Sequence, residues 1–404
     1  MTGAPLALYV HWPFCVSKCP YCDFNSHVRA SVDQEQWRKV LLTDLAHEAR
    51  LFPDRRLSSM FFGGGTPSLM EPATVAAIIE AARDHWSLAD RIEITVEANP
   101  NSVEAGRFAD LALAGVNRLS LGLQSLEDRA LRFLGRAHSA REGFKALETA
   151  QRNFRRVSFD LIYGLPRDTE DSWSAELAQA LSLGTSHLSL YQLTIEPGTR
   201  FATMVERKIM VPLDVERTAT LYELTDAMTS AAGLPAYEIS NHARRGQESR
   251  HNLTYWRYGD YAGIGPGAHG RRSGMATVRH RKPENFLSAV KHNGHGIVEQ
   301  AVLSAREAAD EALLMGLRLR EGIDVDALSE RFGLPVVDWV QVDRLVGSGH
   351  LKRDDGRIAL TAPGRLVIDH ILGRIAPSNA TGVAVALQPE PPLASLKQPE
   401  PQAA

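Results

Sequence analysis

Short apolar runs rich in β-branched residues alternate with longer amphipathic stretches from residue 1 to about residue 235. Such runs predict β-strands, and the stretches between them predict helices. The clearest helix is expected over 33–51, where Trp37, Leu41 and Leu45 recur four residues apart behind a Ser31/Gln34 pair shaped like a capping box. The expected strands are 6–11, 58–62, 91–97, 118–122, 157–163 and 187–194.

Six consecutive strand–helix units indicate one parallel sheet, because neighbouring parallel strands need a crossover connection. Such a sheet is either a barrel or a doubly wound sheet, and both carry ligand-binding loops at the carboxyl ends of their strands. Most of the polar and glycine-rich motifs of this chain follow a predicted strand directly. The pattern therefore favours a barrel domain over 1–235, with ligand groups from several strands converging at its mouth.

The pattern changes after about residue 300, and a second, smaller domain is expected over 301–376. Its first helix begins at Ser304, where Glu307 completes a capping box. A hairpin over 351–360 turns at Asp355-Gly356. Together with shorter helices at 326–332 and 336–346 and a last helix from Pro363, this is a winged-helix-like pattern.

Winged helices often bind DNA, but the third helix of this domain presents Asp338 and Asp343 against Arg344 alone. Because DNA binding needs a cationic face, a packing or docking role is favoured. We interpret 236–300 as a segment that connects the two domains. Residues 377–404 contain six prolines and little periodicity, and they are expected to be a disordered tail.

The composition is that of a globular protein, with 404 residues, 44% hydrophobic residues, 23% charged residues and a formal net charge of −3. No basic field indicates a nucleic-acid partner. The apolar runs are too short to span a bilayer, and the amino-terminal stretch has no features of a targeting peptide. We therefore expect a cytoplasmic protein.

The three cysteines of the chain, Cys15, Cys19 and Cys22, lie on one short loop after the first predicted strand. This C-x3-C-x2-C spacing allows three thiolates to converge on one inorganic centre, and on a four-iron cluster it leaves one iron without a protein ligand. A zinc site completed by His11 or His27 is the alternative. A disulfide is less favoured because the cysteine count is odd.

Two further motifs follow the second and third predicted strands. Gly-Gly-Gly-Thr-Pro at 63–67 includes Gly64, Gly65 and Thr66, and its glycines let a ligand approach the backbone. The same run is equally typical of a tight strand–helix turn. Glu97 ends the third strand and can accept hydrogen bonds from two ribose hydroxyls, or it is a solvated strand-end acid.

Polar residues also mark the fourth and fifth strands. Gln124 closes the fourth, Arg136 follows it, and Asp160 lies inside the apolar fifth strand. Burying a carboxylate is costly without a partner, so something polar must meet Asp160. A ligand and a structural ion pair both satisfy that requirement.

The cysteine spacing resembles that of the radical S-adenosylmethionine (SAM) superfamily, which implies a partial (β/α)6 barrel. In that family SAM chelates the open iron of a [4Fe-4S] cluster, and the reduced cluster cleaves it to a 5′-deoxyadenosyl radical. The resemblance implies that Gly64, Gly65 and Thr66 receive the amino group of SAM. It implies that Tyr9 and Glu97 belong to the same site.

Over about 370 residues the motifs resemble, in order, the oxygen-independent coproporphyrinogen III oxidase family. There Gln124, Arg136 and Asp160 match positions that hold a further SAM molecule. Two departures point to a sister branch, the HemW-type haem chaperones. The oxidases carry another cysteine where this chain has Phe24, and they extend further before the position of Tyr9.

A third pointer to the HemW-type branch is His-Asn-Leu-Thr-Tyr-Trp at 251–256. A neutral imidazole from His251 can ligate haem iron, and Tyr255 and Trp256 offer flat apolar area for a macrocycle. The alternative is that His251 bonds a loop at the end of the barrel while the two aromatic residues pack as core. His269 in the following glycine-rich loop is nearly as good a ligand on chemical grounds.

We therefore expect a haem chaperone with a SAM-binding [4Fe-4S] cluster and without coproporphyrinogen oxidase activity. Its expected partners are haem and apo-haemoproteins, with the membrane surface as one place of delivery and a homodimer as one assembly state. The rival hypothesis is the oxidase itself, which removes carboxyl groups from two propionate chains. A cluster-bearing scaffold without haem is a third hypothesis.

Overall fold

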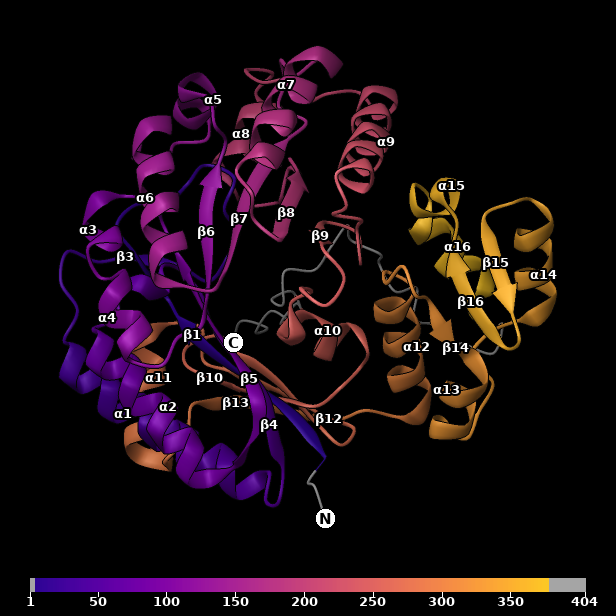
Figure 1. The fold of residues 1–404 in the computed structure, drawn as a ribbon. Helices are drawn as coiled ribbons and strands as arrows, with labels where there is room; N and C mark the ends of the chain where they lie inside the picture. Colours follow the sequence, from indigo (N-terminus) through magenta and orange to yellow (C-terminus); the bar gives the residue numbers. More distant parts are fainter. Residues whose placement is uncertain (1–3, 378–404) are drawn as a thin grey trace, which may run out of the picture.

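The computed structural model describes residues 4–377, and six parallel strands form its centre (Figure 1). They are β1 (Pro5–Trp12), β4 (Arg56–Gly64), β5 (Ser87–Ala98), β6 (Arg118–Gln124), β7 (Arg156–Tyr163) and β8 (His187–Gln192). Their order in the sheet is their order in the chain. A doubly wound sheet reverses its order at a switch point, so this order confirms the predicted partial barrel.

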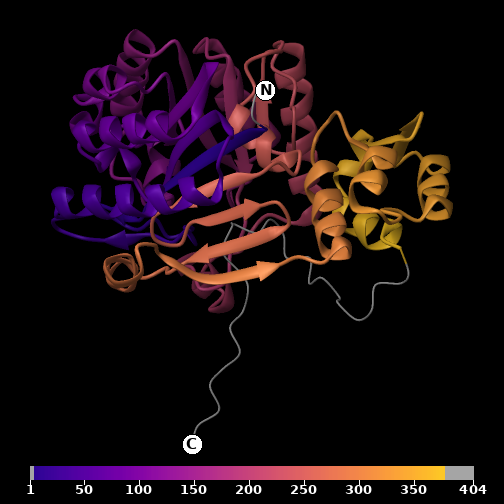
Figure 2. The same ribbon diagram turned by 90° about the horizontal axis from the view of Figure 1, so that it is seen from below.

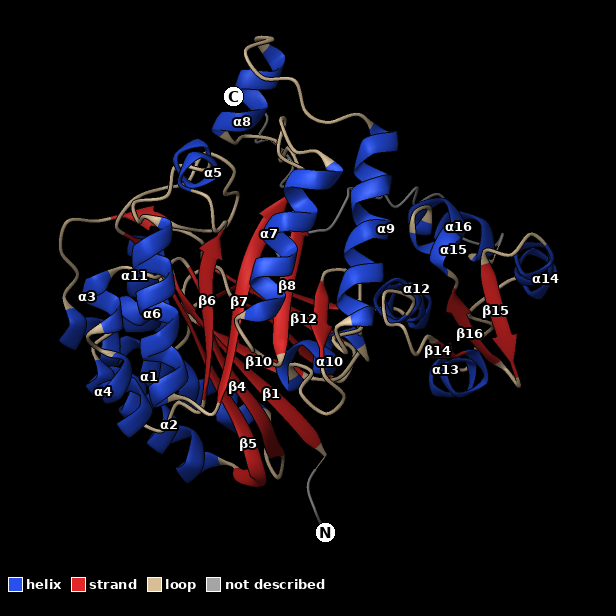
Figure 3. Ribbon diagram, turned by 45° about the horizontal axis from the view of Figure 1, so that its top comes forward, coloured by secondary structure: helices blue, strands red, loops and turns tan. Residues whose placement is uncertain are grey.

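Helices connect these strands, and α1, α2, α4 and α6 lie together on one side of the sheet (Figure 3). The helices are α1 (Gln34–Leu51), α2 (Pro72–His85), α3 (Ser102–Ala105), α4 (Phe108–Leu113), α5 (Asp128–Phe133), α6 (Ala140–Asn153), α7 (Glu170–Ser182), α8 (Arg200–Glu206) and α9 (Val215–Ala231), with a short 3-10 turn, η1, at Pro67–Leu69.

The main core lies between the sheet and these helices. On β1, Leu8 and Val10 are fully buried and pack in the same cluster as Trp37 and Leu41 of α1. Side chains alternate along a strand, so Tyr9 points to the opposite face, toward the barrel interior. The alternation of side chains along β1 thus buries Leu8 and Val10 under α1 and leaves Tyr9 to line the interior.

One local prediction was wrong at the start of α1. The helix is capped by Asp33, whose carboxylate accepts a hydrogen bond from the backbone N–H of Gln36, and not by a Ser31/Gln34 capping box. Asp and Ser are comparable caps, and the nearer carboxylate serves the first free N–H groups.

The segment 236–300, predicted as a connection, supplies further strands to the main sheet (Figure 2). One of these strands, β10, pairs in parallel with β1, and β9 pairs antiparallel with β8 at the other edge. The elements are β9 (Asn241–Ala243), α10 (Arg250–Trp256), β10 (Tyr261–Ile264), β11 (His269–Arg272), β12 (Met275–Arg279), α11 (Pro283–Asn293) and β13 (Ile297–Val302).

The C-terminal part builds a second core and a three-stranded sheet of order β14-β16-β15, which completes the winged-helix-like pattern. The predicted capping box at Ser304 and Glu307 is confirmed. The helix expected from residue 336 begins at Trp339, because Asp338 caps it. The elements are α12 (Ala305–Gly316), β14 (Ile323–Asp324), α13 (Val325–Phe332), α14 (Trp339–Gly347), β15 (Leu351–Asp354), β16 (Arg357–Leu360), α15 (Ala362–Arg365) and α16 (Ile368–Ile375).

The predicted disordered tail begins at residue 377 and otherwise lies outside the described residues. Within residues 4–377, no helix is long and apolar enough to cross a bilayer.

Candidate functional site

The cysteine loop lies at the carboxyl end of β1, at the mouth of the barrel. It is bracketed by two short paired strands, β2 (Phe14–Cys15) and β3 (His27–Val28). All three thiols are free and partly exposed. A backbone hydrogen bond from Cys22 N to Cys19 O (3.2 Å) tightens the loop between the last two cysteines. The loop therefore presents its sulphurs from a constrained backbone.

Each of the three sulphurs is in hydrogen-bond contact with another side chain, and Thr66 and Arg136 are donors to theirs. The contacts are Thr66 Oγ1 to Cys15 Sγ (3.5 Å), Arg136 Nη1 to Cys19 Sγ (3.3 Å) and Ser26 Oγ to Cys22 Sγ (3.9 Å). Hydrogen bonds of this kind favour thiolate over thiol and orient metal-bound sulphur. The surroundings therefore fit a set of thiolate ligands.

Among residues 4–377, no three His, Cys, Asp or Glu side chains are grouped to hold one metal ion. A four-iron cluster places each thiolate on a different iron, so its ligands need no common ion. Burial raises the pKa of the Cys15 and Cys22 thiols above the ordinary value. Binding of iron would release these protons.

The glycine run that ends β4 makes room for the cysteine loop and for its supports. A Cβ on Gly65 would lie 3.0 Å from Cys15 Sγ, and one on Gly64 would lie 2.7 Å from the ring of His11. Gly64 also has φ +115, which L side chains rarely adopt. Close approach, as well as turn geometry, therefore requires glycine at these positions.

A hydrogen-bonded pair from β1 supports the same loop. The Nε2 atom of His11 lies 2.9 Å from the carbonyl oxygen of Asn25, and its Nδ1 atom lies 3.0 Å from the hydroxyl of Tyr9. Since a carbonyl can only accept, Nε2 carries the proton and Tyr9 donates to Nδ1. Burial lowers the pKa of His11 to about 4, which keeps this ring neutral.

Two carboxyl groups face the barrel interior. Glu97 accepts a hydrogen bond from Gly64 N (3.2 Å), and burial, followed by the charge of Asp160, raises its pKa to about 8. Burial also raises the pKa of Asp160 to about 6, while Ser120 Oγ donates to it at 3.4 Å. Within the described chain Asp160 forms no ion pair, so hydroxyl groups meet the polar requirement that the sequence imposed.

Arg136 links several groups at the mouth. It donates to Asn99 Oδ1 (2.6 Å) and Gly122 O (3.0 Å) as well as to Cys19, and Asn99 in turn donates to Thr66 Oγ1 (3.1 Å). Asn99 was not among the residues predicted from the sequence. Its signal is its place two residues after Glu97, at a strand end where polar side chains gather.

Gln124 ends β6 in a strained conformation. Its φ is +70, and the pairing of β6 with β7 shifts its register before this residue. Strain in a non-glycine residue is typical of functional sites. The structure thus brings Tyr9, Gly64, Gly65, Thr66, Glu97, Gln124, Arg136 and Asp160 to the mouth and upper interior of the barrel with the three cysteines.

His251 lies apart from the cysteines, on α10. It is 6% exposed, its ring stacks on Phe61 at 4.9 Å, and its Nδ1 atom lies 3.3 Å from Ser59 Oγ. Its ring centroid is 6.1 Å from that of Tyr9. The imidazole is therefore packed within the barrel, whereas His269 on β11 is partly exposed.

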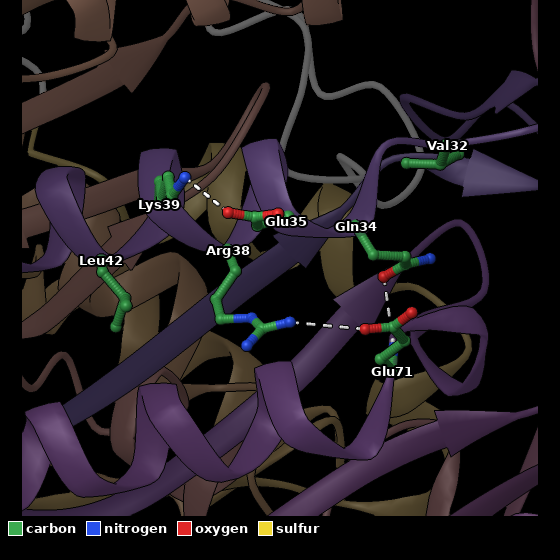
Figure 4. A pocket seen from close by; sticks show the side chains of 7 residues that line it. All are labelled: Val32, Gln34, Glu35, Arg38, Lys39, Leu42 and Glu71. Carbon is green, nitrogen blue, oxygen red and sulfur yellow. Dashed lines mark hydrogen bonds and ion pairs between the residues drawn. The ribbon is translucent and has the colours of Figure 1, made fainter.

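A surface pocket lies elsewhere, between α1 and the start of α2 (Figure 4). Its polar lining is occupied by its own ion pairs, Arg38–Glu71 (3.4 Å) and Lys39–Glu35 (2.6 Å). None of the predicted site residues lines it, so it adds nothing to the site at the barrel mouth.

Comparisons with known proteins agree with this geometry. Residues 9–178 match the model of the radical SAM superfamily, and residues 303–367 match that of the HemN C-terminal domain. Coproporphyrinogen III oxidase (HemN) from Escherichia coli has the same fold, with a TM-score of 0.78 and 23% identity, covering 92% of this chain and 90% of that one.

Two curated relatives are more similar in sequence. Heme chaperone HemW from Escherichia coli is 36% identical, covering 91% of this chain and 97% of the relative. Radical S-adenosyl methionine domain-containing protein 1, mitochondrial, from Bos taurus is 44% identical, covering 78% of this chain and 74% of the relative.

The fold and the three-cysteine loop define a protein of the radical SAM superfamily. Within it, the chain belongs to the family of the HemW heme chaperones and the mitochondrial radical SAM domain-containing protein 1.

Proposed function

We propose that this protein is a haem chaperone that binds haem and delivers it to apo-haemoproteins. The observation that carries the proposal is the identity of 36% to Heme chaperone HemW over 97% of that protein. The oxidase HemN shares the fold at 23% identity, which supports the architecture alone. We also propose that the protein delivers haem in the cytoplasm or at the membrane surface and that it forms a homodimer.

We further propose that Cys15, Cys19 and Cys22 hold a [4Fe-4S] cluster with SAM at its open iron. When bound, the cluster would supply one-electron reduction. The residues proposed to surround one or two SAM molecules are Tyr9, Gly64, Gly65, Thr66, Glu97, Gln124, Arg136 and Asp160. Their position around the cysteine loop supports this assignment. Arg136, in the loop between α5 and α6, donates to Cys19, and the other residues lie on strands of the barrel or directly after them.

The proposed haem ligand is His251, with His269 as the alternative. Burial lowers the pKa of each imidazole to about 4, so both are neutral at pH 7, which is the form that ligates iron. Since His251 is stacked on Phe61, its ring would have to leave that contact to reach iron. His269 needs less movement because it is partly exposed.

Phe24 supports the chaperone over the oxidase. It is 54% exposed two residues after Cys22, where the oxidases have a further cysteine. A phenyl ring at this place cannot ligate metal or donate a hydrogen atom.

The proposal is tested on anaerobically reconstituted protein. We expect a haem-induced Soret band and no conversion of coproporphyrinogen III in the presence of SAM and a reductant. His251→Ala should shift or abolish the Soret band without changing iron and sulfide content. An unchanged band would mean that another residue ligates the iron, and His269→Ala would be the next variant to test. Sustained turnover of coproporphyrinogen III would contradict the chaperone function.

A further inference from the structure

Asn25 stands where the cysteine loop meets the second half of the chain. Its side-chain amide donates to two backbone carbonyls, Pro266 O at 2.9 Å and Arg281 O at 3.0 Å. A primary amide has two hydrogens, and both have an acceptor here. One side chain, three residues after Cys22, therefore ties the loop to two segments more than 240 residues further along.

Both oxygens of Asn25, the backbone carbonyl oxygen and Oδ1, also have hydrogen-bond partners. Its backbone carbonyl accepts the hydrogen bond from His11 Nε2, and its Oδ1 atom lies 3.3 Å from His27 Nε2. His27 begins β3, and its own N–H bonds Pro13 O (2.7 Å). The exit of the cysteine loop is thus held at Asn25 from β1, from β3 and from the distant segments.

The glycine-rich turn after β10 is shaped for this contact. A Cβ on Gly267 would collide with the side-chain amide of Asn25, and one on Gly265 would collide with the backbone of His11. Both glycines have positive φ, at +80 and +94. The close approach of the turn to the cysteine loop is therefore possible with glycine and excluded with a larger residue.

The turn is itself braced. Asp44 accepts hydrogen bonds from Gly265 N (3.2 Å) and from the guanidinium of Arg279 (2.6 Å), and all of Asp44 and Arg279 is buried. Gly267 N donates to His280 O (3.0 Å). A rigid turn provides acceptors in fixed positions. The hydrogen bonds of Asn25 can therefore restrict the movement of the cysteine loop.

We propose that Asn25 is a positioning residue for the iron–sulphur site: it clamps the exit of the cysteine loop to the turn at 265–267 and to Arg281. The inference rests on the proposed cluster at the three cysteines. A loop that carries metal ligands loses conformational freedom when it binds, and the clamp reduces that cost by holding the loop in advance. Removing it weakens retention of the cluster while the barrel remains folded.

The test compares Asn25→Ala and Asn25→Asp with the parent protein, all reconstituted anaerobically. Asn25→Asp keeps Oδ1 but loses both donors. Asn117→Ala is the matched control, because Asn117 also bonds two backbone groups, Ile92 O and Ile94 N (both 2.9 Å), at the opposite end of the strands. Cys15→Ser marks complete loss of the site.

The first measurement is the rate at which a ferrous chelator removes iron, monitored by the loss of visible absorbance. The second is the melting temperature of the apo form. Losing two hydrogen bonds should speed iron release about tenfold or more in both Asn25 variants. Asn117→Ala should release iron at the parental rate. The electron paramagnetic resonance spectrum of the reduced cluster should broaden in the Asn25 variants and stay unchanged in Asn117→Ala.

Gly267→Ala disturbs the same contact from the turn and leaves Asn25 intact. It should also speed the release of iron. If the Asn25 and Gly267 variants fold and release iron at the parental rate, the inference is wrong while the proposed function stands. A parent that acquires no cluster would overturn both.

Discussion

At the scale of the residue, Glu97 shows most clearly how the fold changes side-chain chemistry. Its ordinary pKa is 4.5, and burial together with the nearby Asp160 raises it to about 8. Between these two values the folded protein keeps a proton that the unfolded chain releases. The contribution of Glu97 to stability is therefore complete below about pH 4.5 and is lost as the pH rises to about 8.

We predict that Glu97→Gln flattens this dependence in the protein without cofactors. The parent should melt at a lower temperature at pH 8.5 than at pH 6.5. The melting temperature of the variant should fall less over this range, because glutamine cannot ionise. Scanning fluorimetry at several pH values measures the effect. Glu148→Gln, in an exposed pair with Arg152, is the control and should keep the parental slope. Equal slopes in all three proteins would contradict the pKa assignment.

At the scale of the element, α10 is held against the barrel by Glu93 of β5. The carboxylate of Glu93 accepts hydrogen bonds from His251 N (3.2 Å) and Ser249 Oγ (3.5 Å) and pairs with Arg156 (2.5 Å). Burial pushes the pKa of Glu93 up, but Arg118 and Arg156 hold it below its ordinary value. A carboxylate at a helix amino terminus is also favoured by the helix dipole.

Glu93→Gln should therefore loosen α10 and lower the free energy of unfolding by roughly 2–4 kcal/mol, since it removes the buried negative charge that compensates Arg118 and Arg156. Hydrogen exchange should rise most at the amides of 250–256. Glu35→Gln, in an exposed pair with Lys39, should change stability by less than about 1 kcal/mol. Unchanged exchange in α10 would mean that packing alone holds the helix.

At the scale of the whole molecule, ion pairs and a small apolar cluster attach the C-terminal part to the barrel. Asp226 on α9 pairs with Arg320 and with Arg365, the latter at 3.2 Å. Tyr258, which follows α10, packs with Ala308 and Ala312 of α12. The helix that carries His251 thus lies between the barrel and the C-terminal part.

We predict that Asp226→Ala weakens this attachment by about 1–3 kcal/mol, because it leaves two arginines without their shared carboxylate. Small-angle scattering should show a larger radius of gyration, and proteolysis between residues 300 and 304 should accelerate. Asp343→Ala removes an exposed pair within the C-terminal part, with Arg353 at 2.6 Å, and should leave both quantities unchanged. Identical scattering from both variants would show that apolar contacts suffice.

The sequence predicted the regular elements well because their signals are local. The strands and the capping box at Ser304 follow from residues close together in the chain. Two errors were local: Asp33, and not Ser31, caps α1, and Asp338 caps α14, which therefore begins at Trp339. A third was not local, because the segment 236–300, predicted as a connection, adds strands to the main sheet by pairing with β1 and β8. In the two local cases a neighbouring carboxylate bonds the first free N–H groups of the helix.

By itself, the sequence determined the cysteine loop, the glycine run and the polar residues at the strand ends, because their spacing and order are visible along the chain. Tertiary structure decided which groups touch them. Asn25 meets Pro266 and Arg281 only because β10 pairs with β1, and Asn99 meets Arg136 only because β5 and β6 are neighbours. Such contacts depend on strand pairing and burial, which local patterns do not encode.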